Sequence, residues 1–190
     1  LSSRVIMNRV RDLKGLKAWI PDNDPIAAEL IKSFDVSPIP LGITDVLAGL
    51  QTGLIDAVMA PPAVVLALQW HNHVSYMTDL PLVYIYSMLA MDSKAYKRIS
   101  DEDKLVVRTV VDSMFLKMDS ENRTDNERAY KAIKSIGIEA IVADNVDEWR
   151  AVADGSIEKL IGSGKITPEA VRLYLANLQK YRNGSPAGSD

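Results

Sequence analysis

Two histidines, His71 and His73, are the side chains of this sequence best suited to metal binding or proton transfer. They lie two residues apart, so their side chains diverge on a helix and share a face on a strand. No acidic cluster near them in sequence completes a set of metal ligands, and the spacing favours a helix-end pair bonded to backbone or solvent. We therefore predict no metal site, and whether either histidine has a role stays open.

Motifs for covalent and nucleotide chemistry are absent. The sequence contains no P-loop, no G-x-G-x-x-G, no G-x-S-x-G and no H-E-x-x-H. It has no cysteine, which excludes disulfides and thiolate chemistry. The net charge of −3 argues against a nucleic-acid partner, which requires a clustered excess of Lys and Arg. We predict that the chain is not an enzyme, with no catalytic residues and no cofactor.

The stretch Pro40–Pro62, PLGITDVLAGLQTGLIDAVMAPP, indicates a binding site instead. It predicts a helix from Thr44 to Gln51, a glycine stop at Gly53, and a buried strand over 54–59 that ends at a double proline. A helix followed by a strand and an abrupt turn places side chains at the carboxyl edge of a sheet, where α/β folds bind ligands. That edge is the candidate site.

The preceding residues extend this alternation to β-α-β-α-β. Short strands are expected over 16–20 and 36–41, with a helix between them that Asp22 or Asn23 caps. Pro38 and Pro40 make the second strand an edge strand. The alternation predicts a parallel sheet with right-handed crossovers, and strands 16–20 and 54–59 would then open on one crevice.

Two tryptophans lie near this predicted crevice. Trp19 stands at the end of the first strand, and Trp70 ends a helix from Pro61 that is apolar nearly all round and is expected to be buried. Core packing is an equally good interpretation of Trp19 and the better one of Trp70.

The second half of the chain is predicted to contain a long helix. Residues 74–91 are rich in β-formers and are split by Asp79 and Pro81, which predicts two strands or one bent strand. Ser100 begins a helix that runs to Gly137, apolar at both ends and polar over 119–128, as expected for a strut that joins two lobes. A strand over 138–142, helices over 147–161 and 167–181, and a disordered tail over 183–190 follow.

Four segments, in order, resemble the solute-binding proteins of TRAP (tripartite ATP-independent periplasmic) transporters over about residues 10–180. They are DLKGLK at 12–17, GLQTGLIDA at 49–57, MTDLPLVY at 77–84 and the long polar helix after Ser100. The resemblance implies an α/β, periplasmic-binding-protein-like fold of two lobes around a cleft. It implies a periplasmic receptor that captures a small organic ligand, with a carboxylate as one candidate, and delivers it to membrane permease subunits. A ligand-sensing or protein-interaction domain of the same fold, without a transport role, is the alternative.

The resemblance also implies that the second lobe is largely complete and the first lobe mostly missing, together with the signal peptide. Residues 12–75 would form the second lobe and 76–98 the hinge-crossing strands. Residues 100–137 would form the lobe-spanning helix, and 138–182 the remaining first-lobe strand and C-terminal helices. Surface left uncovered by the missing lobe would favour a homodimer.

Carried over by position, the resemblance implies an apolar site. Trp19 occupies the position of an arginine that clamps a ligand carboxylate, Ala60 that of an asparagine, and Ile43 that of an aromatic pocket residue. An indole stacks on an apolar face but does not neutralise a carboxylate. The ligand is therefore expected to lack a simple carboxylate or to have it held elsewhere. The residues predicted to line the site are Trp19, Ile43, Met59, Ala60, Pro61 and Trp70.

Overall fold

The computed structural model describes residues 1–82 and 88–183. Its strands are β1 Ser2–Ser3, β2 Lys17–Pro21, β3 Ser37–Leu41, β4 Ala57–Val58, β5 Tyr76–Asp79 and β6 Glu139–Val142. Its α-helices are α1 Pro25–Ser33, α2 Val46–Thr52, α3 Pro62–Ala67, α4 Ser93–Lys97, α5 Asp101–Ser135, α6 Val146–Gly162 and α7 Pro168–Arg182. Short 3-10 turns are η1 Val10–Leu13, η2 Ile43–Asp45 and η3 Trp70–His73. Among the described helices, none combines the length and apolarity needed to traverse a bilayer.

The six strands form one sheet in the order β3-β2-β4-β1-β5-β6. Strands β2, β3 and β4 are parallel to one another, as are β5 and β6, but β1 is antiparallel to both β4 and β5. The parallel arrangement predicted for the three strands of the β-α-β-α-β segment is therefore confirmed, while the sheet as a whole is mixed because β1 adds an antiparallel strand. Strand β1 consists of Ser2 and Ser3 alone, and two serines carry no apolar pattern that would predict a buried strand.

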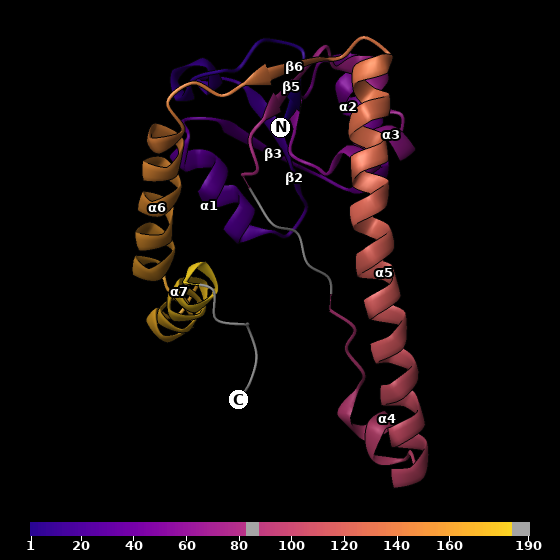
Figure 1. Ribbon diagram of the computed structural model, residues 1–190. Coiled ribbons are helices and arrows are strands. Elements are labelled where there is room, and N and C mark those ends of the chain that lie inside the picture. Colours follow the sequence, from indigo (N-terminus) through magenta and orange to yellow (C-terminus); the bar gives the residue numbers. More distant parts are fainter. Residues whose placement is uncertain (83–87, 184–190) are drawn as a thin grey trace.

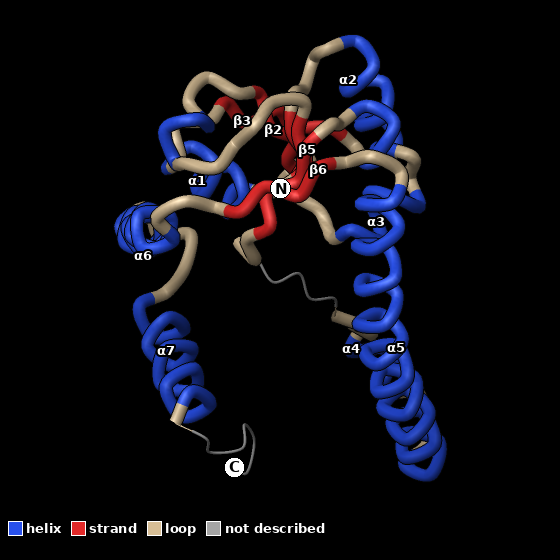
Figure 2. The backbone as a smooth tube through the Cα atoms, turned by 45° about the horizontal axis from the view of Figure 1, so that its top comes forward, coloured by secondary structure: helices blue, strands red, loops and turns tan. Residues whose placement is uncertain are grey.

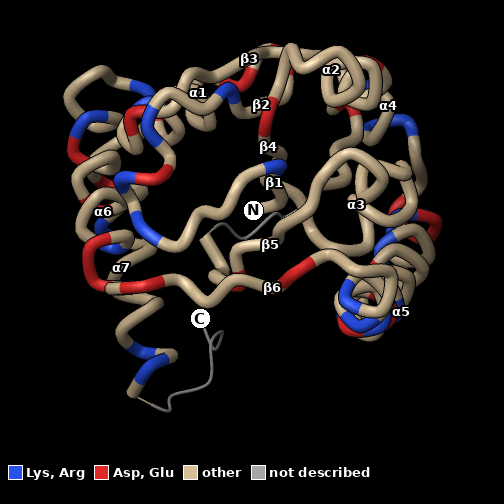
Figure 3. Tube along the Cα trace, turned by 90° about the horizontal axis from the view of Figure 1, so that it is seen from above, with Lys and Arg blue, Asp and Glu red and all other residues tan. Residues whose placement is uncertain are grey.

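Helices cover both faces of this sheet, with α1 and α6 on one side and α2, α3 and α5 on the other (Figures 1 and 3). Along β2 the side chains alternate between the two faces, since Ala18 and Ile20 pack with α1 and α6 while Trp19 packs with the opposite cluster. Strand β4 divides in the same way, with Ala57 on the first face and Val58 on the second. The chain thus has a core on each side of the sheet.

Several predicted element ends are confirmed. Gly53 ends α2 in the left-handed conformation at φ 74°, which a residue without a Cβ adopts freely. Ser100 accepts a hydrogen bond from the Asp103 amide at the start of α5, and Thr167 does the same for Ala170 at the start of α7. Strand β3 is an edge strand, as its two prolines predict.

Other boundaries differ from the prediction. Helix α1 is capped by Asp24, which accepts from the amides of Ile26 and Ala27, whereas Asp22 and Asn23 precede the cap. The buried strand expected over 54–59 is reduced to Ala57–Val58, because the segment before it continues as a turn after α2.

Helix α3 is not buried all round. Val65 is 1% exposed, but Leu68, just beyond the helix, is 38% exposed, so one face packs and the other meets solvent. The second strand expected before residue 91 falls largely on residues 83–87, outside the described residues. The predicted tail lies outside them from residue 184 on.

The two halves of α5 have different surroundings. The C-terminal half, residues 119–135, packs against α3 and the core, and Ala129 and Ile133 are buried. The N-terminal half, residues 101–118, extends beyond the sheet with α4 beside its far end (Figures 1 and 2). Most of its apolar side chains are exposed, including Leu105 at 67% and Leu116 at 76%, whereas Val107 and Val111 are partly buried. The sequence predicts packing at both ends of the helix, and within the described residues most of the apolar surface of the first half is not packed.

Candidate functional site

A cavity of about 500 Å³ opens at the carboxyl edge of the sheet. Strands β4 and β5 run in the same direction because each is antiparallel to β1, so both end at this edge with the start of β1 between them. The volume is within the range of pockets that hold small organic molecules. The lining residues come from β5, from the segments after β4 and β5, from Leu1 and from the C-terminal half of α5: Leu1, Met59, Ala60, Pro61, Pro62, Met77, Thr78, Asp79, Leu80, Pro81, Leu82, Asn126 and Tyr130.

A hydrogen-bonded pair, Asp79 and Tyr130, forms the polar end of the cavity. The Tyr130 hydroxyl donates to Asp79 Oδ2 at 2.7 Å and so connects the end of β5 to α5. This hydrogen bond, with smaller contributions from desolvation and from the Asp79 charge, raises the pKa of Tyr130 above its usual 10.0. At neutral pH the tyrosine is therefore protonated and the hydrogen bond is intact.

Asn126 connects the cavity wall to the start of α3. Helix α3 has Pro61 in the N-cap position and no capping side chain of its own. The Oδ1 of Asn126 accepts a hydrogen bond from the Ala63 amide at 3.3 Å and so supplies the cap from another helix. The Nδ2 of Asn126 donates to the Asn122 carbonyl within α5. The asparagine thereby fixes α3 against α5 beside the cavity.

The cavity contains a negative charge and, among its lining side chains, no Lys, Arg or His. Leu1 also lines the cavity. Asp79 is the charged side chain of the described lining.

Three of the residues predicted to bind ligand, Met59, Ala60 and Pro61, line this cavity. Trp19 and Trp70 do not. Their rings are in edge-to-face contact with centroids 5.2 Å apart inside the core, and both residues are buried.

Trp19 also has a hydrogen-bond partner within the chain, because its Nε1 donates to the Leu41 carbonyl at 3.0 Å. This placement favours the core-packing interpretation of both tryptophans. Ile43 lies in η2, is 56% exposed and is not part of the cavity lining.

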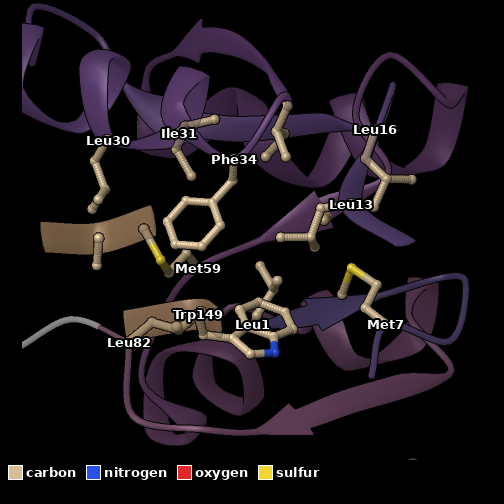
Figure 4. A pocket seen from close by; sticks show the side chains of 14 residues that line it. Leu1, Met7, Leu13, Leu16, Leu30, Ile31, Phe34, Met59, Leu82 and Trp149 are labelled. Carbon is tan, nitrogen blue, oxygen red and sulfur yellow. The ribbon is translucent and has the colours of Figure 1, made fainter. Parts of the chain in front are cut away.

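A second cavity lies between β2, α1 and α6 and is lined by apolar side chains (Figure 4). Phe34 and Trp149 face each other across it, with ring centroids 6.0 Å apart. Its volume of about 30 Å³ is comparable to that of one water molecule, and an apolar space of this size stays dry. It is a gap in core packing, separated from the larger cavity by Leu1, Met59 and Leu82, which line both.

The histidine pair lies in η3, the turn between α3 and β5. Within residues 1–82 and 88–183, no group of three His, Cys, Asp or Glu side chains is arranged to hold a metal ion. The Nδ1 of His71 is buried without a hydrogen-bond partner in the same residues. The structure assigns no function to this pair.

Three polar residues of the lining, Asp79, Asn126 and Tyr130, are missed by reasoning from the sequence. Asp79 interrupts a run of β-formers and so indicates a strand break, although a charged residue at the end of a buried strand is also a site signal. Asn126 and Tyr130 lie in or next to the polar part of α5, where nothing in the sequence indicates which residues face the sheet.

Comparisons with known proteins show which proteins this chain resembles in sequence and in structure. Residues 2–162 match the bacterial extracellular solute-binding proteins of family 7. A curated solute-binding protein of Roseobacter denitrificans is 24% identical over 107 residues, which cover 56% of this chain and 33% of that protein.

Two solved structures illustrate the structural similarity. A TRAP periplasmic solute-binding protein of Xanthobacter autotrophicus with bound β-D-galacturonate matches with a TM-score of 0.75 and 16% identity, over 88% of this chain and 54% of that one. A TRAP solute-binding protein of Pseudomonas putida with bound D-glucuronate gives a TM-score of 0.76 and 17% identity, over 98% and 57%. At these identities the likeness establishes the fold. The chain spans about half the length of these solved structures.

Proposed function

This chain belongs to the family 7 bacterial extracellular solute-binding proteins, and from that premise we propose that it is, or is part of, the periplasmic receptor of a TRAP-type transporter. In this role it captures a small organic ligand and delivers it to membrane permease subunits. Capture is by binding alone, without chemical conversion of the ligand.

The observation that supports this proposal most directly is the 500 Å³ cavity at the carboxyl edge of the sheet. α/β folds bind ligands at this edge because loops from neighbouring strands converge there. Met59, Ala60 and Pro61 supply an apolar wall, and Asp79, Asn126 and Tyr130 supply the few polar groups that orient a ligand. These six residues are our proposed ligand-binding set.

We also propose that residues 12–75 form most of one lobe and that residues 100–137 cross to a second lobe. The exposed apolar side chains in the N-terminal half of α5 support this division, because a helix that ends in solvent does not need them. In this chain alone, the same surface would favour association of two copies.

A binding assay with a cavity-filling variant tests the proposed function. Isothermal titration against D-galacturonate, D-glucuronate, succinate, orotate and a set of small amines is expected to find at least one compound that binds one-to-one. Ala60→Trp fills the cavity and is expected to weaken that binding more than tenfold. Ala67→Trp, on the exposed side of α3, is the matched control and should leave it unchanged. If no compound binds, or if both variants behave alike, the proposal is wrong.

A ligand-sensing domain without a transport role is the alternative. Genes for the membrane permease subunits next to the gene of this protein would favour transport, whereas a sensor would lack them.

A further inference from the structure

We propose that the Asp79–Tyr130 pair selects a ligand with a protonated amine, an ammonium group attached to an apolar body, over an organic anion. The inference rests on the proposed function, since it concerns the ligand of the same cavity. It is drawn from the charges and hydrogen-bond capacity of the lining.

The lining side chains offer hydrogen-bond acceptors in excess. Asp79 uses one oxygen to accept from Tyr130, and its remaining lone pairs are available. The Tyr130 oxygen has donated its proton and keeps its lone pairs. Thr78 Oγ1 donates to the Met7 carbonyl at 2.7 Å and is likewise left with acceptor capacity. A ligand group that donates several hydrogen bonds matches this end of the cavity.

Donors are scarce among the same side chains. Asn126 has both of its polar atoms engaged, Oδ1 by the Ala63 amide and Nδ2 by the Asn122 carbonyl, so a single N–H remains. A carboxylate requires two or more donors or a cation to replace its hydration. The described lining side chains do not provide them.

The charge of the lining side chains also favours an ammonium ligand over an organic anion. The lining contains the Asp79 carboxylate and no cationic side chain. The ammonium of Lys134 lies 5.3 Å from the centre of the Tyr130 ring, but Lys134 is not among the lining residues. An anion in the cavity would be repelled by Asp79, while an ammonium would pair with it. Asp79 is exposed, so water and salt screen this interaction, and the preference for an ammonium is expected to weaken as the salt concentration rises.

The remaining lining defines the rest of the ligand. Met59, Met77, Leu80 and Leu82 are flexible or branched apolar side chains, and Pro61 and Pro81 are rigid ones. Methionine adapts to irregular apolar shapes, so a compact hydrocarbon or aromatic body fits beside the polar end. The ligand class is thus a small apolar amine rather than a sugar acid.

Three probes of the same shape test the inference on the intact chain by isothermal titration at pH 7.5. They are phenethylammonium, the neutral phenethyl alcohol and the anionic 3-phenylpropionate, with D-galacturonate as a fourth. Phenethylammonium is expected to bind about tenfold or more tighter than phenethyl alcohol, and 3-phenylpropionate weakest of the three. Asp79→Asn should remove most of the preference for the ammonium and leave the affinity for the alcohol within about twofold. Asp112→Asn, on the N-terminal half of α5 and outside the cavity, makes the same charge change and should have no effect.

The outcomes separate this inference from the proposed function. If 3-phenylpropionate or D-galacturonate binds tightest and Ala60→Trp abolishes that binding, the receptor function stands and the amine preference is wrong. A cation contributed by residues beyond this chain would give that result. If none of the four probes binds to the cavity, the amine preference is wrong, and the receptor function is then judged by the wider compound panel. An ammonium preference that Asp79→Asn leaves unchanged would also overturn the role of the pair.

Discussion

The two halves of α5 are continuous in sequence and opposite in surroundings. In the C-terminal half, Ile133 is 1% exposed and packs in the core with α3, while in the N-terminal half Leu116 is 76% exposed. Both halves carry apolar residues at helical spacing. The difference teaches that an apolar pattern indicates a surface that can be buried, whereas burial itself depends on whether a partner element is present.

The largest test of this comparison substitutes a buried residue in one half and an exposed one in the other. Ile133→Ala is expected to lower the free energy of unfolding by about 3 kcal/mol, because it leaves a cavity in the core. Leu116→Ala is expected to change it by less than about 0.5 kcal/mol, since leucine and alanine both favour helices and the site is exposed. Urea denaturation followed by circular dichroism measures both. Equal losses would show that the N-terminal half is packed in solution.

A second test asks whether the exposed half associates with another copy. We expect concentration-dependent self-association in sedimentation velocity, and we expect the double variant Val110→Lys, Met114→Lys to weaken it by about tenfold or more. The control is Ser120→Lys with Thr124→Lys, which adds the same charge to the polar stretch of the helix. A parent chain that stays monomeric at all concentrations contradicts this expectation.

A third test concerns Asn126, one of the residues through which the C-terminal half of α5 contacts α3. Asn126→Ala removes the hydrogen bond to the Ala63 amide and is expected to cost about 1 kcal/mol of stability. Asn122→Ala is the control, because Asn122 contributes its backbone carbonyl to this network rather than its side chain. Thermal unfolding should rank the two variants in this order, and the reverse order would exclude the capping role.

The smallest effect concerns the pH dependence of the Tyr130 hydrogen bond. The pKa of the Tyr130 hydroxyl is raised above 10.0 in the folded chain. Below pH 10 the tyrosine is therefore protonated in both the folded and the unfolded state, and the hydrogen bond contributes fully to stability. As pH rises above about 10, the unfolded state loses its proton first, and this contribution to stability disappears. Absorbance titration of the parent minus Tyr130→Phe isolates this residue from the other tyrosines. In Asp79→Ala its pKa should return toward 10.0, and an unchanged pKa would rule out Asp79 as the cause of the shift.

Local signals predict much of the fold. Gly53, Ser100 and Thr167 mark helix ends through their own backbone or side-chain preferences, and the structure has helix ends at each. Asn126 is different, because its partner Ala63 is distant in sequence and no local pattern connects the two. A helix cap supplied by a neighbouring residue can be predicted from the sequence, whereas a cap supplied by a distant segment can be identified only when the fold is known.

The candidate site is predictable in position but only partly in composition. The carboxyl edge follows from the alternation of strands and helices, and Met59, Ala60 and Pro61 lie there. The polar groups do not follow, because they depend on how α5 is rotated against the sheet. Trp19 shows the opposite error, because the sequence predicts it as a site residue and it does not line the cavity. The sequence predicts it near a strand end, whereas it is the middle residue of β2, and the alternation of faces along that strand directs it toward Trp70 in the core.

The two-residue strand β1 has a consequence for the order of folding. Ser2 pairs with Val58 in β4 and with Met77 in β5. Strand β1 can therefore pair only with strands that are distant from it in sequence. Within the described sheet, β1 connects the β3-β2-β4 ladder to the β5-β6 ladder. Contacts this distant in sequence form slowly, because loop closure must precede them. The two ladders are therefore expected to assemble separately, and the edge that carries the cavity is completed when β1 joins them.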